Sequence, residues 1–163
     1  MTNVEALTEV LGKEADAYER LFEKAEGKRQ IIIDRDLSAL EKSTEAEQDL
    51  SDELKGLEGK RIEILKTFTD GDEVPTVTNI IDALPEGDSS RAALQQAKEK
   101  VLEVAGRMQF LNQQNEILLR QAMEMVEFDL TLFKSLRQAP ESGNYGKDAY
   151  NTGELLGSGG FDA

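Results

Sequence analysis

The fold is decided by residues 91–138, which read RAALQQAKEKVLEVAGRMQFLNQQNEILLRQAMEMVEFDLTLFKSLRQ. This stretch of 48 residues contains no proline and a single glycine. Apolar or small side chains recur at spacings of three and four, at Leu94, Ala97, Val101, Val104, Met108, Leu111, Leu118, Ala122, Met125, Leu132 and Leu136. Such spacing is typical of a helix that lies lengthwise against other helices. The sequence therefore predicts one long amphipathic helix.

Two shorter helices are predicted before it. Residues 2–33 place one apolar stripe toward a core, and residues 36–68 place a second. Thr2 or Asn3 can cap the first helix, and the acidic group at Asp34 and Asp36 can cap the second after a tight reversal. Glycines and prolines interrupt residues 69–90, where one short helix is expected at 78–84.

The long helix should begin at a cap formed by the Ser89-Ser90 pair and end at Pro140. We expect an all-α fold, an elongated antiparallel three-helix coiled-coil bundle with one short connecting helix and a long C-terminal helix. Residues 1–138 would form the helical domain. Residues 139–163 hold six of the thirteen glycines and should form a flexible tail.

The three helices differ in length. At ~1.5 Å per residue the long helix is about 72 Å long and the second about 50 Å, so roughly 22 Å of the long helix lacks a neighbour of equal length. If these two helices run antiparallel, Asp36 faces approximately residue 124, and residues 125–138 extend beyond it. Apolar side chains surround the helix there, at Met125, Val126, Phe128, Leu130, Leu132, Phe133 and Leu136. An exposed apolar surface of this kind usually marks a binding site.

Composition excludes several functions. The chain has 33 acidic and 19 basic residues, and its net charge of -14 would repel nucleic acid and anionic membranes. It has no histidine and no cysteine, so the commonest general base, the thiolate nucleophile and the usual zinc ligands are missing. We expect no enzymatic activity, no metal and no cofactor. No apolar run approaches the roughly 20 residues that span a bilayer, and the start MTNVEALTEV does not resemble a signal peptide, so a cytoplasmic protein is expected.

Polar residues interrupt the apolar seams. Asn115 occupies a seam position with Asn112 one turn before it, and the antiparallel pairing would bring Glu47 near both. A structural polar layer is favoured over direct contact with a ligand. Arg61 occupies a seam position of the second helix, where it would pair with Glu99 or Glu103.

Several segments together resemble the FlgN family of flagellar type III export chaperones over essentially the full chain. They are the helix around Tyr18-Glu19-Arg20-Leu21-Phe22, the Lys28-Arg29-Gln30 stretch, Leu54-x-x-Leu57-x-x-x-Arg61, Thr76-x-x-x-Ile80-Ile81, Asn112-Gln113-Gln114-Asn115-Glu116-Ile117-Leu118-Leu119, and Tyr145-Gly146. The asparagine-containing segment is the most specific of them.

The resemblance implies a cytoplasmic chaperone that binds the disordered terminal segments of the hook-filament junction proteins FlgK and FlgL. It would prevent their premature assembly and deliver them to the export gate protein FlhA. The partner-binding residues implied are Asn112, Asn115, Leu118, Leu119, Ala122, Met123, Met125, Val126, Leu130 and Phe133. Tyr145 and Tyr150 in the tail are implied as contacts with the export gate.

A different class of function would use the same surface. In a structural or tethering coiled coil, the apolar end of the long helix would be buried by a second copy of the chain, giving a homodimer. The oligomeric state in solution distinguishes this alternative from the chaperone.

Overall fold

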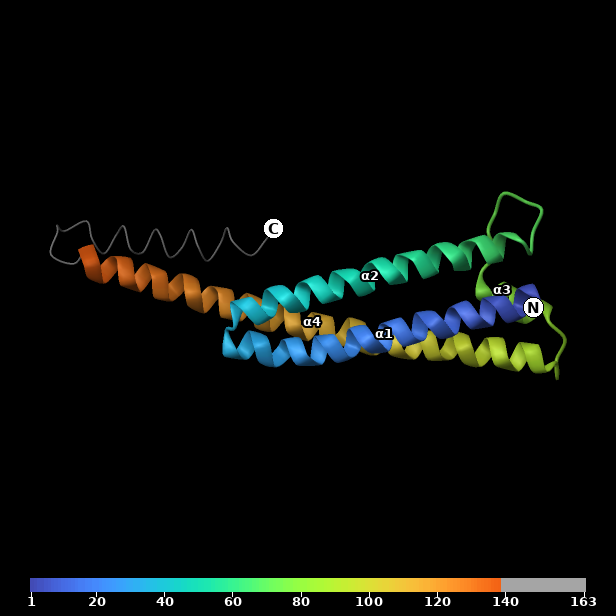
Figure 1. Ribbon diagram of the computed structural model, residues 1–163, viewed down its shortest axis with the longest axis horizontal. Helices are drawn as coiled ribbons and strands as arrows, with labels where there is room; N and C mark the ends of the chain where they lie inside the picture. The colour runs from blue at the N-terminus through green and yellow to red at the C-terminus, as the bar shows by residue number, and fades with distance from the viewer. Residues whose placement is uncertain (139–163) are drawn as a thin grey trace.

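The computed structural model describes residues 1–138, and these residues form four helices and no strand (Figure 1). They are α1 (Asn3–Asp34), α2 (Leu37–Lys66), α3 (Val77–Ala83) and α4 (Ser89–Gln138). The all-helical prediction is confirmed, and the helix boundaries lie within about two residues of those expected. Pro140, Tyr145 and Tyr150 and the predicted flexible tail lie outside the described residues.

Side-chain caps explain why three of the helices begin where they do. The Thr2 hydroxyl accepts a hydrogen bond from the Glu5 N–H, and the Glu5 carboxylate accepts one from the Thr2 N–H. Asp36 caps α2 by accepting from the Ala39 N–H. Thr76 forms a reciprocal cap with Asn79 at the start of α3.

The predicted cap of the long helix is wrong. Ser89 already belongs to α4, and the Asp88 carboxylate accepts a hydrogen bond from the Ser90 N–H at 2.9 Å. An aspartate carboxylate is at least as good a cap as a serine hydroxyl, and its negative charge is favourable near a helix N-terminus.

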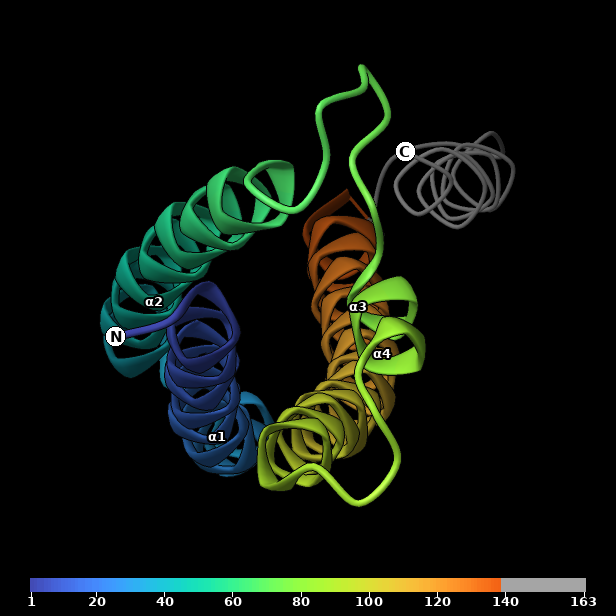
Figure 2. The same ribbon diagram turned by 90° about the vertical axis from the view of Figure 1, so that its right-hand side faces the viewer.

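Helix α1 is the central helix of the bundle. It packs along both α2 and α4, whereas α2 and α4 form no comparable interface with each other. Figure 2 shows α2 and α4 on either side of α1 when the bundle is seen from one end. Helices α1 and α4 run in the same direction and α2 runs opposite to them, as an up-down-up chain requires (Figure 1).

The sequence predicted that the second helix packs against the long helix, and this prediction is wrong because α2 packs on α1 instead. Glu47 pairs with Lys28 of α1 at 3.1 Å, and Arg61 pairs with Glu14 of α1 at 2.8 Å. Neither reaches the partner on α4 that the sequence suggested. The expected register is nevertheless close, because Arg35 in the α1–α2 turn lies 3.3 Å from the Met125 sulfur.

The core consists of two apolar clusters along α1. The larger lies at the end of the bundle that holds α3, and it includes Leu7, Leu11, Leu57, Leu65, Ile80, Ile81 and Leu94. The smaller lies midway along α4 and is built from Leu21, Ala25, Met108 and Leu111. The two clusters hold roughly the first half of α4 against α1, as far as Leu111.

Candidate functional site

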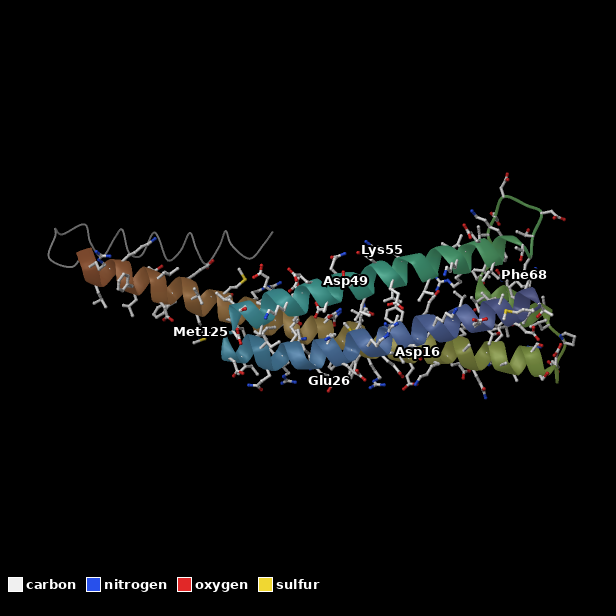
Figure 3. All side chains as sticks on the ribbon, in the orientation of Figure 1. Asp16, Glu26, Asp49, Lys55, Phe68 and Met125 are labelled. Atoms are coloured by element: carbon white, nitrogen blue, oxygen red, sulfur yellow. The ribbon has the colours of Figure 1, made fainter. Side chains whose placement is uncertain are left out.

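The α1–α2 turn determines how much of α4 is covered. Arg35 ends α1 in the left-handed conformation, with φ at 56°, and Asp36 then caps α2. The reversal is complete within two residues, so both helices stop at the same level along α4. Arg35 lies there against Met125, and its guanidinium is 3.9 Å from the Asp129 carboxylate. Figure 3 labels Met125 next to this turn.

Beyond this level α4 has no neighbouring helix among the described residues (Figure 1). We call residues 125–138 the overhang. Between 45% and 67% of each of its large apolar side chains is exposed: Met125, Val126, Phe128, Leu130, Leu132, Phe133 and Leu136. Seven large apolar side chains within about 20 Å of helix are far more than a helix exposed to solvent usually carries. The overhang is therefore the strongest candidate for a binding surface.

An apolar groove of about 310 Å³ leads from the bundle to the overhang. Helix α4 contributes Leu119, Ala122, Met123 and Val126 to its lining, and the α1–α2 turn contributes Ile31, Ile32, Leu37 and Leu40. Leu37 is 78% exposed at the start of α2. Together with Leu40 it forms the α2 side of the groove, where a partner can reach it.

The turn residues of this groove were missed by sequence reasoning. Ile31, Ile32 and Ile33 follow one another, and three consecutive residues of a helix cannot all face one core. Ile33 is 54% exposed as a result. An apolar run directly before a predicted reversal was the signal that could have identified them.

The predicted partner-binding residues occupy three environments. Met123, Met125, Val126, Leu130 and Phe133 are exposed, and Leu118, Leu119 and Ala122 are half-buried. Asn115 is only 4% exposed, and its Nδ2 donates to the Ala25 carbonyl at 2.7 Å. This geometry fits the structural polar layer.

Asn112 is exposed and lies apart from the overhang. It lines a polar groove of about 400 Å³ between α1, α2 and α4, together with Glu14, Glu47, Glu58 and Arg61 among others. This groove lies between α2 and α4, which both pack on α1 but form no comparable interface with each other.

The charged groups of this polar groove are partly buried. Glu14 is 3% exposed, and burial raises the pKa of its carboxyl despite the opposing charge of Arg61. One carboxylate oxygen of Glu14 and one of Glu47 accept no hydrogen bond from any described residue. Each glutamate is bound through its other oxygen, to Arg61 and Lys28 respectively, so the pairs act as ion pairs that tie α2 to α1.

Residues 1–138 hold no cluster of three side chains suited to binding a metal ion. None of their helices carries an apolar stretch long enough to cross a membrane.

The described residues form an elongated helical bundle whose long helix ends in exposed apolar side chains, an arrangement typical of helical proteins that bind a partner. Comparison with family models identifies the family: the model described as FlgN protein matches residues 1–153. The chain therefore belongs to the FlgN family, whose members are flagellar export chaperones and not enzymes. Neither a curated protein nor a solved structure matches the chain.

Proposed function

We propose that this chaperone binds the disordered terminal segments of the hook-filament junction proteins FlgK and FlgL through the overhang and its groove. The observation that carries the proposal is the set of exposed apolar side chains on the overhang. Helix-in-groove recognition needs such side chains on one element and an amphipathic segment on the other. A segment that is disordered alone can fold onto this surface because burial of its apolar face offsets the entropy of ordering.

The composition of the overhang suits more than one partner. Met123 and Met125 lie beside the groove, and unbranched thioether side chains adapt to different shapes. Covering both the overhang and the apolar face of a FlgK or FlgL segment would prevent either surface from aggregating. The protein would do so in the cytoplasm and then deliver its cargo to the export gate protein FlhA. Tyr145 and Tyr150, outside the described residues, remain the predicted contacts with the gate.

Calorimetric titration tests this proposal. The full chain is titrated with peptides that cover the C-terminal segments of FlgK and FlgL from the same cell. Tight binding with a negative heat-capacity change is expected, because coupled folding onto an apolar surface buries apolar area.

Truncating two anchors, Leu130→Ala together with Phe133→Ala, should weaken binding by about 10- to 100-fold, as expected for residues at the centre of an interface. The chain offers a matched control. Leu102 and Phe110 are also on α4 and are 61% and 62% exposed, but they lie beside the bundle and outside the overhang. The Leu102→Ala and Phe110→Ala double variant should bind normally.

Equal binding by both double variants would refute the assignment of the site. A wild-type chain that sediments as a concentration-independent dimer and binds neither peptide would instead favour the self-associating coiled coil.

A further inference from the structure

The apolar surface of the overhang is too wide for one partner helix. At about 100° per residue the apolar side chains of the overhang, together with Met123 just before it, divide into two stripes whose centres are roughly 135° apart. Stripe A consists of Met125, Phe128, Leu132 and Leu136, and stripe B consists of Met123, Val126, Leu130 and Phe133. Within each stripe, successive side chains are three or four residues apart, which is the spacing of a helix-packing seam. One helix lying along the overhang covers one such seam.

Stripe A continues the seam through which α4 packs on α1. Leu111 and Asn115 are buried in that seam, and steps of seven residues from them give Met125, Leu132 and Leu136. The same steps give Asp129, which Arg35 approaches at the end of α1. Stripe A therefore lies where α1 would pack if α1 were longer.

Stripe B continues from the apolar groove. Met123 and Val126 line the groove opposite Leu37 and Leu40 of α2, and Leu130 and Phe133 carry the same seam beyond the turn. Stripe B therefore lies on the side of α4 where α2 begins. The two stripes face the positions in which two separate helices would extend the bundle.

We propose that the partner supplies two amphipathic helical segments, one on each stripe, which continue the lines of α1 and α2 along α4 and complete a three-helix bundle. This inference rests on the proposed function and specifies the form of the bound partner. Each segment spans about 14 residues, the length of the overhang at ~1.5 Å per residue. A twofold dimer through the overhang would supply only one helix to each copy, so it would leave one stripe exposed.

Three matched double variants test the proposal, each changing one leucine and one phenylalanine of α4 to alanine. The first removes Phe128 and Leu132 from stripe A, the second removes Leu130 and Phe133 from stripe B, and the control removes Leu102 and Phe110. All six side chains are between 47% and 67% exposed, so none of the variants should alter folding. Circular dichroism and sedimentation of each variant check this. Affinity is measured by calorimetry for the full terminal segment of FlgK and for shorter peptides that hold a single predicted helix.

The stripe A and stripe B variants should each lose at least 10-fold in affinity for the full segment, and the control should lose less than about 2-fold. A single-helix peptide should bind at least 10-fold more weakly than the full segment. Loss of affinity in only one stripe variant, or full affinity of a single-helix peptide, overturns the two-helix proposal and leaves the proposed function standing. Full affinity of both stripe variants overturns the proposed site itself. The proposal would also be overturned if the wild-type chain dimerises and only the stripe A variant is monomeric. In that case stripe A binds a second copy of the chain.

Discussion

Replacement of Asn115 by leucine should stabilise the protein, although it removes a buried hydrogen bond. The bond from Nδ2 to the Ala25 carbonyl is 2.7 Å long, and a typical bond of this kind contributes about 1 kcal/mol. The carbonyl of Ala25 lies within α1 and keeps its intrahelical bond when the amide is lost. The cost of the substitution is therefore small.

The gains exceed this cost. Oδ1 of Asn115 is buried and accepts no hydrogen bond from the described residues, an arrangement that costs about 1–3 kcal/mol. A buried leucine contributes about 1.5–3 kcal/mol by transfer from water, and differences of shape cost up to about 1.5 kcal/mol. The expected increase in the free energy of unfolding is about 1–3 kcal/mol.

Urea unfolding followed by far-ultraviolet circular dichroism measures this difference. Asn115→Asp is the informative companion, because a buried carboxylate facing the Ala25 carbonyl should destabilise the chain by about 3–5 kcal/mol at neutral pH. Affinity for the FlgK segment should not change in Asn115→Leu, since the side chain is buried. A loss of stability above about 1 kcal/mol in Asn115→Leu would refute the assignment of Asn115 as a replaceable polar layer.

Three further substitutions give defined outcomes. Burial raises the pKa of Glu14, so the stability that this group contributes is complete below its ordinary pKa and is lost as pH rises through the folded pKa. The free energy of unfolding of Glu14→Gln minus that of the wild type should therefore increase as the pH rises above the ordinary pKa of a glutamate, and a constant difference in urea titrations would contradict this. Arg35→Gly should raise the free energy of unfolding by about 0.5–1 kcal/mol, because glycine adopts the φ of 56° without strain. Thermal unfolding measures this change. A decrease would mean that the contacts of Arg35 with Met125 and Asp129 stabilise the chain by more than the strain destabilises it. Leu37→Ala should weaken binding of the FlgK segment by about 3- to 10-fold in calorimetry. The free energy of unfolding should change by less than about 0.5 kcal/mol. Unchanged affinity would show that the α1–α2 turn is not part of the binding site.

The sequence was sufficient to predict the helices because their signals are local. Thr2, Asp36 and the glycines and prolines after Thr69 lie at the helix ends themselves, and the apolar periodicity lies within each helix. The unequal helix lengths were also enough to predict that α4 extends past the α1–α2 turn. That prediction needs only the rise per residue and the position of one reversal.

The neighbours of each helix could not be predicted in the same way. All three long helices carry similar seams, and a seam does not specify which other helix covers it. Arg61 was therefore assigned to Glu99 or Glu103, while the structure pairs it with Glu14. The apolar groove was missed for a related reason, because Leu37 and Val126 are distant in sequence and meet only where the turn lies against α4.

Hydrogen exchange of the full chain, with and without the terminal segment of FlgK, tests most directly whether the overhang binds the partner. The account predicts slower exchange of amides in residues 119–138 and at the α1–α2 turn, with little change along the rest of α1 and α2. Such protection would place the partner beside the exposed apolar side chains of α4. Protection confined to the polar groove around Glu14 and Arg61, with unchanged exchange in the overhang, would contradict the account.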